Sequence, residues 1–456
     1  MELPQSFAEQ MKTELGSQWD AFVASYEEKA CRGYRLNQTK QRLCRAKESM
    51  VNGTGEDPGV DWCANGRYLT EESMSKDPLH FAGAYYIQEP SAMLPAALLC
   101  AQPGDRVLDL CAAPGGKSTQ LLDDMRDQGL LVSNDISASR AKAIVKNVER
   151  FGFGQILVTA ESPDKLAAVF PEYFDKILVD APCSGEGMFR REPSMREEWV
   201  RKGPDFYQPL QREILSQAVQ MLRPGGRLVY STCTFCQAED ENNAAWLQEM
   251  YPEMHLIEDH KIMPHTHRGE GQYAALFEKR DPSDKGKDSA KTEAKIKTDR
   301  VGNFKEKGNE AVLDFFKLIK KTDATDRKRL DLLSTTQWYL KDDQLYALPV
   351  DIHPMKKLRF LRTGLLLGEV KKGRFEPSQA LAMYLTADQF ANTVEFARGD
   401  ERIIRYLKGE TVEADGATHR GKNGWCLVLM DGLPLGWAKR TGETLKNKYE
   451  PGWRMQ

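Results

Sequence analysis

Two cysteines follow short apolar segments and lie among small and polar residues. Cys183 is in residues 180–185 (DAPCSG), and Cys233 is in residues 230–234 (YSTCT). A cysteine attacks carbon as a thiolate, so the site of a reactive cysteine should lower its pKa. A thiolate that adds to carbon 6 of cytosine makes carbon 5 nucleophilic enough to take an electrophilic methyl group, and elimination later frees the thiol. Asp180 is placed to hold the amino group or a protonated ring nitrogen of such a base.

Each of these cysteines alone is more often a buried structural residue. Two cysteines at neighbouring strand ends, beside a glycine-rich loop, favour the catalytic interpretation. Cys233 and Cys236 also form a C-x-x-C motif, but a zinc or redox site usually needs a second such pair or a redox-type fold. His265 and His267 form an isolated pair, and we expect no metal site.

Residues 109–118 (DLCAAPGGKS) form the glycine-rich loop, between a predicted strand and a predicted helix. Small residues let the backbone approach a ligand, and the helix start offers unpaired N–H groups. The spacing matches neither the dinucleotide fingerprint nor the phosphate loop of nucleotide triphosphatases. Asp135 closes the next strand, where a carboxylate can accept both hydroxyls of a ribose. A turn without a ligand and a helix cap are the alternatives; together the two loops favour an adenosyl ligand.

The elements that must position these residues alternate between strand and helix. This rhythm is typical of an α/β, doubly wound, mostly parallel sheet, in which ligands bind outside the carboxyl ends of the strands. The predicted strands are residues 106–110, 130–135, 156–159, 176–180 and 227–232, and helices are predicted at 118–126, 137–151 and 207–222.

Smaller units flank this core. Residues 1 to about 35 show helical spacing of apolar residues, and Asp431-Gly432 between two apolar runs is a hairpin signal. We predict an N-terminal α+β unit, the core, a charged linker, a first C-terminal α+β domain and a final β-rich domain. Their expected ranges are 1–85, 86–280, 281–300, 301–385 and 386–456.

Composition limits the class of protein. The chain has 456 residues, 41% of them hydrophobic, and its nine cysteines indicate free thiols in a reducing compartment. It lacks a signal-peptide pattern and an apolar run of ~18–20 residues, so we expect a cytoplasmic protein. Residues 279–456 hold 35 Lys+Arg and 26 Asp+Glu, a net charge of +9, against −12 for the remainder. The C-terminal part is the better candidate for a polyanion surface, although such an excess is also ordinary on a solvated surface.

The core resembles the Nol/Nop/Sun family of RNA cytosine-5 methyltransferases. The resemblance covers about residues 75–280 and is carried by residues 86–93 (YIQEPSAM), 109–118, 180–185 and 230–234. It implies a Rossmann-like core with a seven-stranded, mostly parallel sheet, and S-adenosyl-L-methionine as cofactor. It also implies that Cys233 is the nucleophile and that Cys183 assists release of the product. The cofactor and base pocket would be lined by Asp135, Asp180 and the loop residues Cys111, Ala112, Ala113, Pro114, Gly115, Gly116 and Lys117.

One stretch departs from the family pattern. The family usually has an acidic residue just after the third strand, where it meets the adenine. Residues 160–164 (AESPD) make that assignment ambiguous, and we take Glu161 as the candidate.

The C-terminal segments 418–425 and 446–454 are similar to a PUA-like RNA-binding module that one branch carries, that of bacterial 16S ribosomal RNA methyltransferases. Basic residues interleaved with Trp425, Trp437 and Trp453 fit phosphate contacts and base stacking, but each tryptophan can equally belong to the core of a small barrel. We expect an RNA partner, most simply 16S rRNA or the small subunit, and a monomer.

Three alternatives stay open at this point. Transfer RNA can be the substrate of the same cytosine-5 chemistry. A methyltransferase for amino groups would need no thiol, and it commonly carries an Asn/Asp-Pro-Pro-aromatic tetrapeptide, from which residues 180–183 differ. An RNA-binding assembly factor with a vestigial pocket would bind no cofactor.

Overall fold

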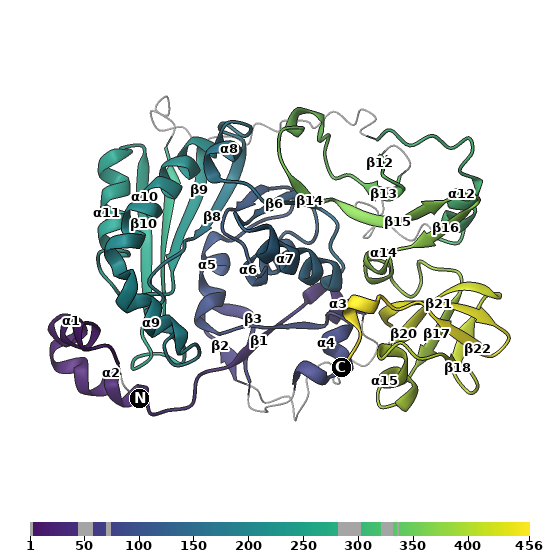
Figure 1. Cartoon of the computed structure of the whole chain (residues 1–456), viewed down its shortest axis with the longest axis horizontal. Helices are drawn as coiled ribbons and strands as arrows, with labels where there is room; N and C mark the ends of the chain where they lie inside the picture. Colours follow the sequence, from purple (N-terminus) through teal and green to yellow (C-terminus); the bar gives the residue numbers. More distant parts are fainter. Residues whose placement is uncertain (1–2, 44–57, 70–73, 281–301, 321–331, 335–336) are drawn as a thin grey trace.

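The computed structural model describes residues 3–43, 58–69, 74–280, 302–320, 332–334 and 337–456. The predicted linker, 281–300, lies outside the described residues. The described elements form four β-sheets, the largest of which is flanked by the N-terminal helices on one side and by the two C-terminal sheets on the other (Figure 1).

The largest sheet contains the five predicted strands in parallel arrangement. Its order is β10-β11-β9-β8-β5-β6-β7-β14, and β9, β8, β5, β6 and β7 are parallel to one another. Their fully apolar segments are buried on both faces, as expected of a parallel sheet. The bounds are β5 Arg106–Asp109, β6 Leu130–Asn134, β7 Ile156–Thr159, β8 Phe174–Asp180, β9 Leu222–Thr232, β10 Met254–Ile262 and β11 Gln272–Lys279.

Helices cover both faces of this sheet, which confirms the doubly wound prediction. Apolar side chains of α5, α6 and α7 pack on one face, and those of α8, α10 and α11 pack on the other. In α7 the buried residues Ala141, Ile144, Val148 and Phe151 recur at helical spacing. The bounds are α5 Leu94–Leu99, α6 Gly116–Asp124, α7 Ala138–Phe151, α8 Pro163–Ala167, α9 Ser194–Arg201, α10 Gly203–Met221 and α11 Glu241–Met250.

The sheet has an eighth strand that the sequence did not predict. Strand β14 (Phe360–Thr363) comes from the predicted first C-terminal domain and pairs antiparallel with β7, beyond the seven strands expected. Its four residues, FLRT, are too few to show an alternation of apolar and polar side chains. The first C-terminal domain is therefore tied to the core by backbone hydrogen bonds.

Three smaller sheets surround the core. The N-terminal sheet has the order β2-β3-β1-β4, the first C-terminal sheet β12-β13-β15-β16, and the last sheet β18-β22-β21-β20-β17-β19. The strands of the first two are β1 Gly33–Leu36, β2 Gly59–Val60, β3 Cys63–Tyr68, β4 Tyr85–Ile87, β12 Trp338–Lys341, β13 Gln344–Ala347, β15 Leu365–Lys371 and β16 Arg374–Pro377. Those of the last are β17 Thr393–Phe396, β18 Val412–Glu413, β19 Thr418–Arg420, β20 Gly424–Met430, β21 Leu433–Thr441 and β22 Thr444–Asn447.

The helices outside the core are short. Those of the N-terminal region are α1 Gln5–Leu15, α2 Trp19–Ser25, α3 Gln38–Leu43 and α4 Pro78–Phe81, and those of the C-terminal region are α12 Glu310–Phe316, α14 Gln379–Tyr384 and α15 Glu401–Leu407. The predicted N-terminal helix is thus two helices joined by a 3-10 turn, and the chain is extended again from Gly33.

The predicted hairpin is confirmed at Asp431 and Gly432. Both residues have positive φ, 47° and 85°, as a two-residue hairpin turn requires, and they join β20 to β21. Trp437 and Trp453 are buried in this part of the structure, at 1% and 8% exposure. Base stacking by these two side chains is thereby excluded in this conformation, and only Trp425 is partly exposed.

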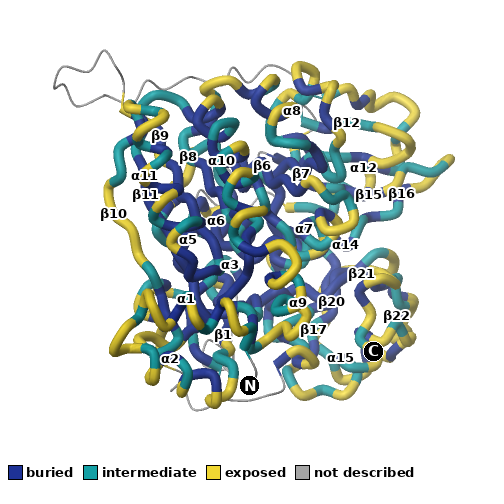
Figure 2. The backbone as a smooth tube through the Cα atoms, turned by 60° about the vertical axis from the view of Figure 1, so that its left-hand side comes forward, coloured by how far each residue is buried: buried dark blue, intermediate teal, exposed yellow. Residues whose placement is uncertain are grey.

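The N-terminal and C-terminal sheets share one apolar cluster. Tyr34 and Tyr85 of the first pack with Val394, Val428 and Tyr449 of the last. The Lys40 ammonium donates to the Met383 carbonyl at 2.6 Å, also between these regions. Most of the buried segments, drawn in dark blue, lie in the interior of the molecule, and the exposed ones lie mainly at its edges (Figure 2). None of the described helices is long and apolar enough to cross a membrane.

Candidate active site

The two predicted thiols lie against each other. Strands β8 and β9 are adjacent and parallel, with Asp180 opposite Ser231, so the loops that follow them leave the sheet side by side. The Sγ atoms of Cys183 and Cys233 are 3.4 Å apart. Cys183 is buried and Cys233 is partly exposed, so Cys233 is the thiol that a substrate can reach.

The Cys183 thiol holds its proton tightly. Its hydrogen bond with Cys233 and its burial raise the pKa of Cys183 well above the usual range. A thiol that keeps its proton can donate a hydrogen bond to the neighbouring Cys233 sulfur, 3.4 Å away.

Two buried carboxylates fix the cysteine loops. Glu239 accepts the Ser184 N–H at 3.0 Å and the Gln211 amide at 2.7 Å. Glu186 accepts the Phe235 N–H at 2.8 Å and the Trp199 indole N–H at 2.9 Å. Burial raises the pKa of Glu239, and it raises that of Glu186 to about 7. The same carboxylates thus link the loop after β8 to the loop after β9.

Sequence reasoning missed these two glutamates. Glu186 follows a recognised motif directly, and Glu239 begins a run of three acids, Glu239 to Glu241, that looks solvated. The signal that could have identified them is the need of two polar loops, packed against each other, for buried acceptors.

Asp180 lies between a cation and two neutral donors. Lys117 Nζ is 2.8 Å from Asp180 Oδ2, while Ser231 and Gln272 donate to Oδ1 at 2.8 and 3.3 Å. Burial disfavours the charge on Lys117, but the attraction of Asp180, Asp109 and Cys233 outweighs it and raises the Lys117 pKa. The glycine-rich loop thereby brings a positive charge close to the predicted nucleophile and the predicted base-binding acid.

The glycine-rich loop has the shape expected of a ligand cradle. Gly115 has φ 103° and directly precedes α6, and a Cβ on it would lie 3.1 Å from the Ile144 backbone. The Ala112 N–H donates to the Asn134 carbonyl at 2.7 Å, which ties the loop to the end of β6. Cys111 is half-buried, and burial raises the pKa of its thiol, which favours the protonated form.

Asp109, the last residue of β5, points into the protein. It is fully buried, it accepts the Ser118 hydroxyl at 2.6 Å, and burial raises its pKa to about 7. Through the hydrogen bond from Ser118, Asp109 fixes the first turn of α6 against the end of β5.

Asp135 lies where the sequence predicted, just after β6. It is 2% exposed, accepts the Ser137 N–H at 2.9 Å, and its second oxygen is 3.2 Å from the exposed Arg140 guanidinium. Glu161 follows β7 on the next loop. Its N–H donates to Asn134 at 3.0 Å, but its Oε1 accepts the Arg359 N–H at 2.7 Å and its Oε2 is 3.3 Å from Lys165. The adenine contact assigned to Glu161 stays a prediction.

The residues present fit an adenosyl cofactor. Asp109 Oδ1 and Gln88 Oε1 are buried oxygens for which the described residues provide no hydrogen-bond donor, and both residues adjoin the first turn of α6. With the N–H groups of that turn and the Asp135 carboxylate, they offer donors and acceptors at the carboxyl ends of β5 and β6. Within the described segments, no cluster of three or more His, Cys, Asp or Glu residues could hold a metal ion.

This fold and site define an S-adenosylmethionine-dependent RNA methyltransferase. Residues 96–278 match the family model described as 16S rRNA methyltransferase RsmB/F. Residues 3–90 match the N-terminal domain of 16S rRNA methyltransferase RsmF, residues 325–385 its first C-terminal domain, and residues 393–455 its PUA domain. The chain belongs to this 16S rRNA methyltransferase family.

Comparisons with individual proteins point to the same family. The chain is 31% identical to ribosomal RNA small subunit methyltransferase F of Enterobacter sp. (strain 638), covering 98% of this chain and 95% of that protein. A methyltransferase homologue from Pyrococcus horikoshii is 28% identical, with a TM-score of 0.51 over 58% of this chain and 91% of its own. NSun6 from the same organism, 20% identical with a TM-score of 0.53 over 61% and 98%, shares the fold.

Proposed function

We propose that this enzyme methylates carbon 5 of a cytosine in 16S rRNA through a covalent bond between Cys233 and the base. The observation that carries the proposal is the pair of thiols 3.4 Å apart, one buried and protonated and the other partly exposed, beside the Lys117–Asp180 pair. A methyltransferase for amino groups has no use for this pair. The family relationship supports ribosomal RNA over transfer RNA.

The reaction begins when the target cytosine enters the site. A cytosine must leave its stack to enter the site. The Cys233 thiolate then adds to carbon 6, while Asp180, held by Lys117, accepts a hydrogen bond from the amino group or from a protonated ring nitrogen and so favours the addition. The cofactor supplies a methyl group on a sulfonium. Carbon 5, now enamine-like, forms the new carbon–carbon bond as the methyl–sulfur bond breaks.

Release reverses the first step. A general base of the enzyme or the solvent removes the proton from carbon 5. The electron pair of that C–H bond re-forms the 5,6 double bond, and the bond between carbon 6 and Cys233 Sγ breaks. The leaving sulfur is a thiolate, and the Cys183 S–H lies within hydrogen-bond distance to stabilise it. Cys183 thus assists product release by donating a hydrogen bond to the departing thiolate.

For the cofactor, we propose that residues 111–117 cradle its methionine part and that Asp135 accepts the ribose hydroxyls, displacing the exposed Arg140. We also propose that the enzyme is a cytoplasmic monomer with the five-part organisation given by the sequence. The basic excess after residue 279 supports the C-terminal domains as the RNA grip.

The test is transfer of a labelled methyl group from S-adenosylmethionine to 16S rRNA, as naked RNA and as assembled small subunit, followed by mapping of 5-methylcytosine. Cys233→Ala should abolish transfer, whereas Cys236→Ala, a buried cysteine three residues away, should retain it. Full activity of Cys233→Ala would overturn the covalent mechanism. Methylation of transfer RNA alone would overturn the substrate assignment.

A further inference from the structure

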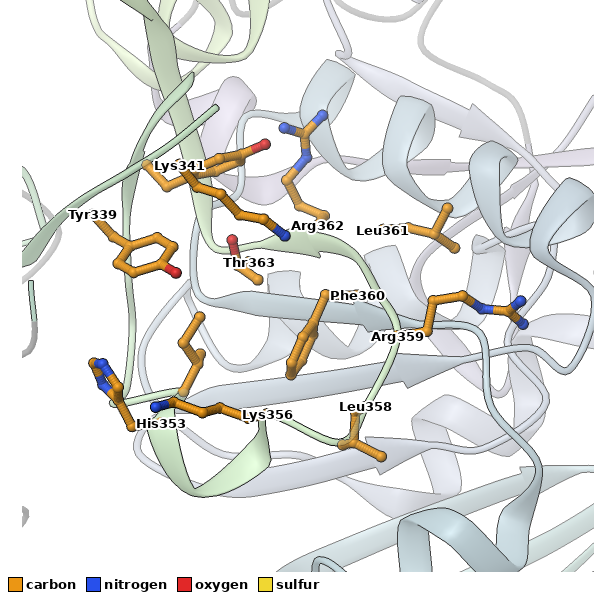
Figure 3. Close-up of a pocket in the computed structure, with 12 residues that line it drawn as sticks. Tyr339, Lys341, His353, Lys356, Leu358, Arg359, Phe360, Leu361, Arg362 and Thr363 are labelled. Atoms are coloured by element: carbon orange, nitrogen blue, oxygen red, sulfur yellow. The ribbon is translucent and has the colours of Figure 1, made fainter. Parts of the chain in front are cut away.

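A pocket of about 340 Å³ lies away from the two cysteines, where the first C-terminal domain meets the core. One wall is the β12–β13 hairpin, which contributes Tyr339, Lys341 and Tyr346, and the opposite wall is residues 352–363, which include β14. In Figure 3, Tyr339, Lys341, His353 and Lys356 surround an opening in front of the Phe360 ring.

The pocket is basic. Its described lining residues include Lys341, Lys356, Arg359 and Arg362 but no acid. Two of the four cations are already engaged: Arg362 pairs with Glu149 at 2.5 Å, and the Arg359 guanidinium donates to the Ala160 carbonyl. Within the described residues, neither Lys341 nor Lys356 has an ion-pair partner closer than 4 Å.

The lining also offers aromatic surface. Tyr339 and Phe360 are partly exposed, and the Tyr346 ring is held in place with the Arg362 guanidinium 5.8 Å from its centre. His353 is exposed and hydrogen-bonded to Asp351, the acid beside the opening. Exposed lysines next to accessible aromatic rings are the combination that binds a nucleotide of single-stranded RNA, through its phosphate and the face of its base.

The pocket is also fixed relative to the active site. Phe360 pairs with Thr159 at the end of β7, and the Arg359 N–H donates to Glu161 on the loop where the cofactor's adenine is expected. Leu358 and Met355 anchor the same segment in the main apolar core. A ligand held by residues 356–363 is therefore held at a constant distance from the site of methyl transfer.

We propose that this pocket binds one unpaired nucleotide of the substrate RNA, remote from the target cytosine, with Lys341 and Lys356 contacting phosphate and Tyr339 and Phe360 stacking the base. The proposal rests on the proposed function for the identity of the RNA. It assigns to the first C-terminal domain a role in setting the register of the substrate on the enzyme, separate from that of the last domain.

The test compares the full-length enzyme with three variants in equilibrium binding of 16S rRNA at several salt concentrations. These are the double variant K341A/K356A, the single variant Tyr339→Ala, and the control K305A/K307A. The control removes the same charge from two exposed lysines of the same domain that do not line the pocket. Methyl transfer is measured in parallel at limiting and at saturating RNA.

K341A/K356A should weaken RNA binding about tenfold and flatten the dependence of log K on log salt by about 0.7 for each lost phosphate contact, the value for single strands. Tyr339→Ala should weaken binding about fivefold or more without changing that slope. In both, KM for RNA should rise while kcat at saturating RNA stays at the wild-type value, because the pocket does not touch the reacting atoms. Free CMP and inorganic phosphate, added as competitors, should leave the difference in RNA affinity between the wild type and the two variants unchanged.

Binding and salt slope equal to the control in both variants would overturn the pocket assignment, even in an enzyme that methylates normally. A wild-type enzyme that transfers no methyl group, yet shows the predicted binding differences, would count against the proposed function and leave the pocket standing. Competition by free CMP at micromolar concentration would show a mononucleotide site in place of an RNA site.

Discussion

Cys183 Sγ and Cys233 Sγ lie 3.4 Å apart at the ends of two neighbouring parallel strands, and the hydrogen bond with Cys233 together with burial raises the pKa of the Cys183 thiol. The two thiols are chemically equal and are made different by their surroundings. Cys183 is buried and its raised pKa favours the protonated thiol, whereas Cys233 is partly exposed and lies near Lys117. This asymmetry supports the proposal that Cys233 attacks the base and that Cys183 assists its release.

The first prediction follows from that assignment. In Cys183→Ala, addition of Cys233 to the base and methyl transfer should proceed, but release should slow by about 10²-fold or more, the usual contribution of a positioned proton donor. A covalent RNA–protein adduct should then accumulate and be visible by denaturing gel electrophoresis after one turnover. Adding Cys233→Ala should abolish the adduct. Wild-type turnover with no adduct in Cys183→Ala would show that Cys183 is structural.

A second prediction concerns the carboxylate that joins the two loops. The Ser184 N–H and the Gln211 amide both donate to Oε2 of Glu239, so Glu239→Ala leaves two buried donors without this acceptor. An unsatisfied buried donor costs about 1–3 kcal/mol, and unfolding in urea should show a loss of that size. Multiple-turnover activity should fall with it, because the Cys183 loop is no longer fixed. Glu249→Ala, the same change at an exposed position, should do neither; equal stability of the two variants would remove Glu239 from this role.

A third prediction tests the cofactor carboxylate. Asp135→Asn should weaken binding of S-adenosylmethionine about tenfold or more, since hydrogen bonds to a charged acceptor contribute roughly 1.5–3 kcal/mol. Isothermal titration calorimetry of the RNA-free enzyme measures this directly. Asp205→Asn, on an exposed part of α10, should bind as the wild type does. RNA affinity should be unchanged in both, and cofactor affinity unaffected by Asp135→Asn would place the ribose elsewhere.

The strands of the core and the cysteines at their ends could be predicted because each rests on local sequence. The apolar runs 156–159 and 176–180 are buried strands wherever they lie in the sheet, and parallel neighbours bring their polar ends together. The thiol pair and the Asp180 position follow from that geometry.

The missed features depend on contacts between distant residues. Nothing near residues 360–363 indicates that they extend the core sheet beside β7. The burial of Glu186 and Glu239 likewise depends on two loops folding over them. Trp437 is a core residue because the C-terminal sheet closes around it. Its basic neighbours in the sequence suggest an exposed position instead.

The last prediction uses the buried acid beneath the cofactor loop. Burial raises the pKa of Asp109 to about 7 in the folded protein, against 3.8 for the free side chain. The folded state therefore binds the proton more tightly than the unfolded chain does. The stabilisation that this proton provides is complete below about pH 4 and is lost as pH rises through about 7.

Asp109→Asn, which keeps an acceptor for Ser118, carries no such dependence. The unfolding free energy of wild type relative to this variant should fall between pH 5 and pH 8 by about 2–4 kcal/mol, the scale set by 1.36 kcal/mol per pKa unit. Glu186, also raised to about 7, is present in both proteins, so its contribution cancels. Urea denaturation at four pH values, with the exposed Asp314→Asn as reference, measures the difference. Parallel stability curves for wild type and Asp109→Asn would mean that Asp109 is ionised in the folded enzyme, with its charge compensated by Lys117.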